Sequence, residues 1–233
     1  MPEAPALLTV SGLEAWYGES HILHGVDFTV GRGELVTLLG RNGAGKTTTL
    51  KSIMGMTAKR RGSVVFDGAE TIGLTSDRIA RAGIALCPEE RGIFASLDVE
   101  ENLLLPPRVA PGGLTIAQIY ELFPNLYERR KSPGTKLSGG EQQMLAIGRI
   151  LHTGAKLLML DEPTEGLAPV IIEQIGLTIR RLKEAGFTIL MVEQNFRWAS
   201  ALADRFYVME HGRVIDHFVA SDLEANMEKL HRY

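Results

Sequence analysis

A glycine-rich segment carrying a lysine and two threonines directly follows the apolar run Leu35 to Leu39. It reads Gly40-Arg41-Asn42-Gly43-Ala44-Gly45-Lys46-Thr47-Thr48 and satisfies the pattern Gly-x4-Gly-Lys-Ser/Thr between a strand and a helix. Glycines allow backbone N–H groups to point at phosphate oxygens, and the helix that follows adds the positive end of its dipole. We expect Lys46 to reach the β- and γ-phosphates of a nucleotide and the Thr47 hydroxyl to bind Mg²⁺. The complete pattern disfavours the alternative, a glycine-rich turn without a ligand.

Two acids end a second apolar run, Leu157 to Leu160. Asp161 and Glu162 therefore stand at the carboxyl end of a buried strand, where open α/β sheets hold their ligands. We assign Asp161 to Mg²⁺, directly or through its hydration shell, and Glu162 to polarising the water that attacks phosphorus. A solvated strand end is the alternative, which the phosphate loop upstream makes less favourable.

A second candidate anion site begins at Ser138. Ser138 is a plausible N-cap and Glu141, three residues later, completes a capping box, while Gly139 and Gly140 leave the helix start open. A well-capped helix with no ligand is the alternative. One nucleotide has no use for two such sites in one chain, so we expect a dimer in which this helix start meets the γ-phosphate held by the partner's loop.

Apolar runs of strand length must position these residues. The runs Leu35 to Leu39, Leu157 to Leu160 and Thr188 to Val192 are apolar on both faces, which is typical of a buried parallel sheet. Alternation at Val26, Phe28 and Val30, a short strand at 63–66 and a hairpin at His211-Gly212 predict further strands, the first two in an N-terminal antiparallel layer. Helical spacing over about 99–151 predicts a helical insertion, with a loop at the proline-rich segment 106–113.

Composition describes a globular protein. The 233 residues are 45% hydrophobic, with 25 basic against 28 acidic side chains, and no stretch approaches the roughly 20 apolar residues that span a bilayer. Residues 1–5 lack the features of a signal peptide, and the single Cys87 suits a reducing compartment as a small buried hydrophobe. The net charge of −3 gives no reason to expect nucleic acid, so we interpret Lys59-Arg60-Arg61 and Arg129-Arg130-Lys131 as solvated faces. The six histidines show no spacing of a zinc site.

The motifs in this order resemble the ATP-binding subunits of ABC transporters. In that resemblance Gly40 to Thr47 is Walker A, Leu137 to Gln143 is the signature motif, Leu157 to Asp161 is Walker B, and Pro163 to Leu167 is the D-loop. The resemblance implies one ABC ATPase domain over 1–233, with a β layer and RecA-like core at about 1–88 and 152–233 and a helical insertion at about 89–151. It also implies that ATP and Mg²⁺ are bound, that Glu162 is catalytic, and that Tyr17 stacks on adenine. A buried strand aromatic is the alternative interpretation of Tyr17.

Two departures from the general pattern narrow the resemblance. Glu89 stands where most members have a glutamine near Mg²⁺, and Gln194 stands where most have a histidine that contacts the γ-phosphate. A carboxylate binds Mg²⁺ but repels phosphate, and a glutamine donates hydrogen bonds without becoming cationic. With segments such as Glu89 to Phe94 and Gly166 to Pro169, these departures resemble the LivF-type ATPases of branched-chain amino-acid uptake systems. Asp98 is a small mismatch, because many members carry threonine there.

The narrower resemblance implies an ATP-hydrolysing importer subunit for branched-chain or other hydrophobic amino acids, peripheral on the cytoplasmic face of the cell membrane. Its expected partners are transmembrane permease subunits, a second ATPase subunit that is a paralogue or a second copy, and, indirectly, a solute-binding protein. Leu103 to Pro107 is expected to face the transmembrane partner. The alternatives are an importer of urea or short amides, an exporter subunit, and a non-transport ABC ATPase that acts on nucleic acid.

Overall fold

The computed structural model describes residues 6–222. The expectations drawn from residues 1–5, and His231 among the histidines, lie outside this range. Within it, none of the helices combines the length and the apolar character that a membrane crossing requires.

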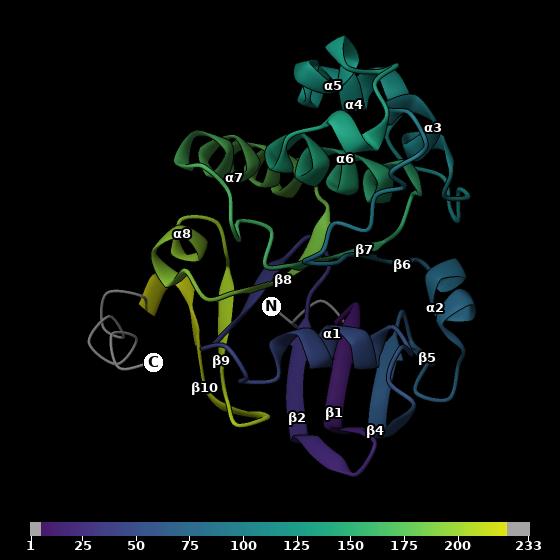
Figure 1. Cartoon of the computed structure of the whole chain (residues 1–233). Coiled ribbons are helices and arrows are strands. Elements are labelled where there is room, and N and C mark those ends of the chain that lie inside the picture. Colours follow the sequence, from purple (N-terminus) through teal and green to yellow (C-terminus); the bar gives the residue numbers. More distant parts are fainter. Residues whose placement is uncertain (1–5, 223–233) are drawn as a thin grey trace.

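An antiparallel sheet of four strands forms one end of the molecule (Figure 1). Its order is β2-β1-β4-β5, with bounds β1 Leu8–Tyr17, β2 Ser20–Val30, β4 Lys59–Phe66 and β5 Ala69–Glu70. Along β2, Val26, Phe28 and Val30 are buried while Asp27 is exposed, as their alternation predicts. The expected antiparallel layer is confirmed, and its strand β4 begins four residues before the predicted start at residue 63.

A second sheet of six strands carries the apolar runs. Its order is β10-β9-β3-β8-β7-β6, with bounds β3 Leu35–Leu39, β6 Ile84–Cys87, β7 Leu157–Asp161, β8 Thr188–Glu193, β9 Arg205–Glu210 and β10 Arg213–Val219. All neighbours are parallel apart from the β9–β10 hairpin. Strand β6 is not among the predicted strands, because its four residues give little periodicity. Since β3, β8 and β7 are adjacent and parallel, the segments after them meet at one edge of the sheet.

Two cores lie on opposite faces of this sheet. Successive residues of each central strand alternate between them: in β7, Leu158 and Leu160 belong to one core and Leu157 and Met159 to the other. The first core is covered by α6 and α7, and the second contains α1 and the antiparallel sheet. Side chains buried on both faces explain why these strands are continuously apolar.

Eight α-helices complete the described part of the chain, and α3 to α6 gather at the end opposite the antiparallel sheet (Figure 1). Their bounds are α1 Lys46–Ile53, α2 Ser76–Ala82, α3 Val99–Leu104, α4 Ile116–Leu122, α5 Pro124–Glu128, α6 Gly139–His152, α7 Pro169–Glu184 and α8 Phe196–Ser200, with 3-10 turns at Gly134–Lys136 and Ala220–Asp222. The described segment 99–151 contains helices α3 to α6 and none of the named strands, as expected, and 106–113 is a loop. The division of the chain near residues 88 and 152 stays a prediction.

Arg60 corrects one expectation. Its charge run predicts a solvated face, but its guanidinium is half-buried and donates to the carbonyls of Ser52, Ile72 and Leu74 at 2.5 to 2.9 Å. Burial lowers the pKa of Arg60. Side chains in a run of charges are usually solvated. Here one of the three side chains connects α1 to the segment after β5, and no local sequence pattern predicts this contact.

Candidate functional site

Glycines at two positions shape the loop between β3 and α1, because a side chain there would meet neighbouring groups. A Cβ on Gly40 would lie 2.4 Å from the Met209 carbonyl oxygen, and one on Gly45 would lie 2.8 Å from the Leu23 side chain. Gly45 also has a φ of 102° at the N-cap of α1. The loop therefore passes closely beneath β2 and β9 and opens directly into the helix N-terminus.

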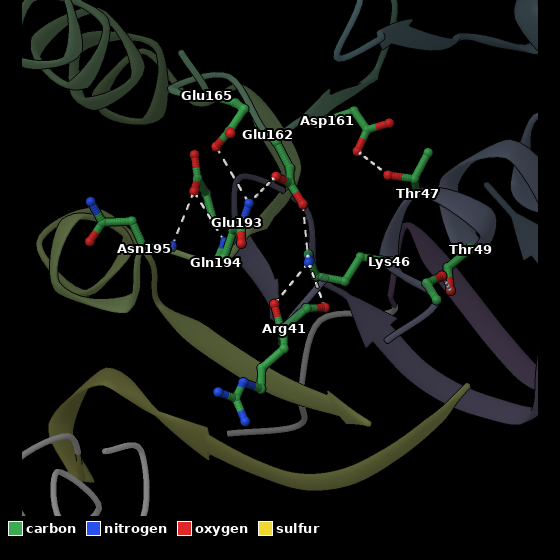
Figure 2. Close-up of polar contacts among 12 residues, drawn as sticks. Arg41, Lys46, Thr47, Thr49, Asp161, Glu162, Glu165, Glu193, Gln194 and Asn195 are labelled. Atoms are coloured by element: carbon green, nitrogen blue, oxygen red, sulfur yellow. Dashed lines mark hydrogen bonds and ion pairs between the residues drawn. The ribbon is translucent and has the colours of Figure 1, made fainter. Parts of the chain in front are cut away.

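Lys46 lies at the first position of α1 and is 4% exposed. Its Nζ donates to the carbonyls of Gly40 at 2.8 Å and Arg41 at 3.2 Å, and lies 3.0 Å from Glu162 Oε1 (Figure 2). The ammonium group is thus surrounded by oxygens of its own loop and by the acid that follows β7. It occupies a place where phosphate oxygens could replace the carboxylate as its partner.

Asp161 and Thr47 face each other across the site. Thr47 Oγ1 donates to Asp161 Oδ1 at 2.9 Å, while Asp161 Oδ2 is buried and has no hydrogen-bond partner among residues 6–222. Burial raises the pKa of Asp161 to about 6, and the charges of Glu89 and Glu162 add to this against the Thr47 hydrogen bond. A buried carboxylate oxygen without a partner, beside a hydroxyl, fits a hard divalent cation such as Mg²⁺.

Glu162 is held by the next strand. Its backbone N–H donates to the Val192 carbonyl at 3.1 Å, and Gln194 Nε2 donates to Glu162 Oε2 at 2.7 Å (Figure 2). Glu162 has a φ of 43°, an uncommon conformation for a non-glycine residue. Its side chain is 8% exposed, so one oxygen contacts the lysine and the other the amide in a largely dry setting.

Lys46, Thr47 and Glu162 line a cleft of about 490 Å³, whereas Asp161 lies outside its lining and reaches it through Thr47. The lining residues come from the phosphate loop, β2 and the segments after β6, β7 and β8: Ile22, Asn42, Gly43, Gly45, Lys46, Thr47, Thr48, Glu89, Glu162, Glu165 and Gln194. The cleft therefore brings together the predicted loop, Glu162, Gln194 and Glu89. A cationic lysine and helix N-terminus on one side and carboxylates on the other suit a phosphate chain that carries a metal ion.

The predicted residues at the start of α6 do not line this cleft. Ser138 is the N-cap, its Oγ accepting from Glu141 N at 3.3 Å and its N–H donating to Glu141 Oε2 at 2.7 Å, so the expected capping box is confirmed. Gly140 packs against Ile171, where a Cβ would come within 2.9 Å. The start of α6 therefore does not share a cleft with the phosphate loop of the same chain, and its role in binding an anion stays a prediction.

Tyr17, the last residue of β1, also lies outside the cleft lining and is 47% exposed. Its alternative interpretation as a buried strand aromatic is wrong. The aromatic ring is available at the surface, and adenine stacking stays a prediction.

Two further carboxylates at the site were missed by the sequence analysis. Glu165 Oε2 accepts from Gln194 Nε2 at 3.4 Å, and the buried Glu193 accepts from Thr164 Oγ1 at 2.8 Å. Glu165 lies in the predicted D-loop and Glu193 directly follows the run Thr188 to Val192, so the only signal was an acid in the loop after β7 or at the end of β8. Their partners depend on the order of strands in the sheet, which the sequence does not state.

Comparisons with known proteins agree with this geometry. Residues 23–165 match the family model described as ABC transporter. The chain is 44% identical over 229 residues to the high-affinity branched-chain amino acid transport ATP-binding protein BraG of Pseudomonas aeruginosa, covering 94% of this chain and 96% of that protein. It is 37% identical over 230 residues to the probable branched-chain amino acid transport ATP-binding protein LivF of Archaeoglobus fulgidus, covering 96% and 98%.

A solved structure described as the ATP binding subunit of an ABC transporter has the same fold. It matches with a TM-score of 0.80 and 29% sequence identity, over 97% of this chain and 98% of that chain. The expected α/β fold with an N-terminal antiparallel layer is confirmed.

Proposed function

We propose that this chain, which belongs to the ABC transporter family and is an ATP-hydrolysing subunit, powers the uptake of branched-chain or other hydrophobic amino acids. The observation that supports the hydrolytic site is the buried contact of Lys46 with Glu162 at the edge where β3, β8 and β7 end. The similarity to BraG over 94% of the chain supports the class of solute.

In the proposed mechanism the phosphate loop binds the triphosphate of ATP. Backbone N–H groups from Gly43 to Thr48 and the Lys46 ammonium contact the β- and γ-phosphates, and Lys46 leaves Glu162 to do so. Glu162 then accepts a proton from water, and the water oxygen bonds to the γ-phosphorus. The bond between the γ-phosphorus and the β–γ bridging oxygen breaks, and ADP and phosphate are released.

Thr47 Oγ1 and Asp161 would hold Mg²⁺, with Glu89 close enough to act on the same charge. When bound, Mg²⁺ supplies positive charge that stabilises the transferring phosphoryl group. The unpartnered Asp161 Oδ2 is the feature of this chain that fits it.

Gln194 positions Glu162 and contacts the γ-phosphate in this proposal. Its amide donates to the Glu162 carboxylate at 2.7 Å and so fixes the orientation of one carboxylate oxygen. A glutamine keeps this contact without titrating, whereas a histidine at this position would gain or lose charge near neutral pH.

The working unit is a pair of ATPase subunits. The phosphate loop and the capped start of α6 are both built to receive anions, yet they do not line one cleft in this chain. Residues Ser138 to Glu141 would then meet the γ-phosphate bound to the other subunit's loop, and closure of the pair would move the membrane domains. A paralogue is the proposed partner, because the LivF-type group usually supplies two different ATPase subunits.

Membership of the family gives this chain permease subunits as partners in a membrane-associated complex. Its proposed location is the cytoplasmic face of the cell membrane, and a separate solute-binding protein would select the solute. No nucleic acid is expected as a partner in this proposal.

The test is transport by the assembled complex. Proteoliposomes with the permease subunits, the second ATPase subunit and the binding protein are loaded with ATP and offered leucine, isoleucine, valine and phenylalanine, with urea and a short amide as competing solutes. ATP-dependent uptake of the amino acids, absent with Glu162→Gln, supports the proposal. Uptake of urea or amide alone, export, or ATP hydrolysis stimulated only by DNA or RNA contradicts it.

A further inference from the structure

Glu193 is a buried carboxylate that the proposed mechanism does not use. It ends β8, is 2% exposed, and uses both of its oxygens. Oε1 accepts from the Thr164 hydroxyl at 2.8 Å, and Oε2 accepts from the backbone N–H groups of Gln194 at 3.2 Å and Asn195 at 3.3 Å. Figure 2 shows the contacts of this carboxylate with Gln194 and Asn195, in the segment after β8.

These hydrogen bonds join the two segments that carry the reacting groups. Thr164 lies two residues after Glu162, and Gln194 directly follows Glu193. We call the two carboxylate oxygens of Glu193, with their partners on the two segments, the Glu193 fork. The fork fixes the backbone of Gln194. The Gln194 side-chain amide in turn contacts Glu162 at 2.7 Å. A closed circuit runs from Glu162 through Thr164, Glu193 and Gln194 back to Glu162.

Burying the Glu193 carboxylate destabilises the folded chain unless its hydrogen bonds compensate for the lost hydration. Burial raises the pKa of Glu193, and the nearby charge of Glu162 adds to this against the Thr164 and Asn195 hydrogen bonds. No lysine, arginine or histidine among residues 6–222 forms an ion pair with it. A buried acid without a cation destabilises a protein unless hydrogen bonds compensate it.

We propose that Glu193 is a positioning residue for hydrolysis: its two carboxylate oxygens clamp the segments after β7 and β8 together, so that Gln194 holds Glu162 toward the γ-phosphate. The inference rests on the proposed role of Glu162. Glu193 is not among the residues that line the cleft, so it would act through Gln194 and Thr164. A glutamine in its place offers one oxygen and one NH₂ group, so it cannot accept on both sides of the fork.

The test compares Glu193→Gln with Thr164→Val, each in the assembled transporter. Each removes one side of the fork at nearly constant volume, and each is expected to lower kcat for ATP hydrolysis by at least about fivefold with KM changed less than about twofold. Because both variants open the same circuit, the double variant is expected to fall no further than the worse single one. Thr164→Ser restores the hydroxyl and is expected to restore kcat.

A matched control removes a buried threonine hydroxyl elsewhere. Thr178 is 3% exposed and donates to its own helix at Gln174, so Thr178→Val is expected to leave kcat unchanged. Unchanged kcat in Glu193→Gln, multiplying losses in the double variant, or equal losses in Thr164→Ser and Thr164→Val would overturn the inference. If Glu162→Gln itself turns over normally, the proposed function fails first; if it is inactive while Glu193→Gln is not, this inference alone fails.

Discussion

Lys46 Nζ and Glu162 Oε1 lie 3.0 Å apart, with both side chains less than one-tenth exposed. The lysine begins α1 and the acid follows β7, so the pair connects the phosphate loop with the end of the strand two positions away in the sheet. The opposite charges of the two groups compensate the cost of burying each of them. In the proposed mechanism phosphate oxygens replace the carboxylate at Lys46, and Glu162 then faces water.

Lys46→Ala is expected to weaken ATP binding by about tenfold or more, because it removes the only side-chain cation lining the cleft of the described residues. Titration of the purified chain with ATP and Mg²⁺ measures this. Lys131→Ala is the control, since Lys131 pairs with Glu100 on the helical side and is not in the cleft lining. Equal ATP affinity in Lys46→Ala and wild type would exclude the assigned loop role.

Glu162→Gln is expected to reduce ATP turnover by about a hundredfold or more, because the amide keeps the size of the carboxylate but cannot accept a proton. ATP should remain bound and the closed pair of subunits should accumulate, as measured by size-exclusion chromatography with retained nucleotide. Glu128→Gln, at the end of α5, is the matched control. Turnover within about threefold of wild type rejects the general-base role.

The position of the site at the carboxyl edge of the parallel sheet can be predicted from the sequence, because the patterns that identify its strands are local. Runs that are apolar on both faces identify β3, β7 and β8, and the polar residues after them must then share the carboxyl edge of a parallel sheet. The capping box at Ser138 is likewise a contact between residues three apart, and it forms as expected.

Contacts between distant segments could not be predicted in the same way. The pairs Lys46 with Glu162 and Glu193 with Thr164 depend on β8 lying between β3 and β7, an order set by packing of the whole sheet. Arg60 is a similar case. Its charge run predicts a solvent-exposed side chain, but hydrogen bonds to three carbonyls of two other segments hold it half-buried.

Asp161 gives a pH prediction for the chain without metal or nucleotide. Its pKa is raised from 3.8 to about 6 in the folded chain, so its protonation stabilises the fold, an effect fully present below the unfolded value and lost as pH rises through 6. Between pH 7.5 and 5, wild type should gain about 1 kcal/mol of unfolding free energy relative to Asp161→Asn. Urea unfolding in EDTA at both pH values measures the difference, and a loss in place of a gain contradicts the burial of this carboxylate.

Gln194→His is expected to leave ATP turnover unchanged or to raise it, because an imidazole N–H can also donate to Glu162 and its cationic form can contact the γ-phosphate. The variant should acquire an additional pH dependence near 6.5, the ordinary pKa of a histidine. Steady-state hydrolysis from pH 5.5 to 8.5 measures both effects. A fall of more than about threefold at every pH shows that the amide itself is required.

The segment Leu103–Pro107 provides the test of coupling. Leu104 and Leu105 are 55% and 48% exposed, and Pro106 and Pro107 line an apolar cavity of about 670 Å³ that also includes Met54 and Leu86. Exposed apolar side chains beside such a cavity are typical of a protein–protein contact, here proposed with the permease.

Leu104→Ser and Leu105→Ser together are expected to lower solute uptake by about tenfold while ATP affinity stays within about twofold of wild type, because neither residue lines the nucleotide cleft. Val170→Ser, at a position 69% exposed at the start of α7, removes a similar apolar surface elsewhere and should leave uptake unchanged. Uptake and nucleotide binding are measured on the same preparations. Parallel loss of both in the Leu104 and Leu105 variant would show that the segment supports the fold of the ATPase, and the assigned contact with the permease would then be withdrawn.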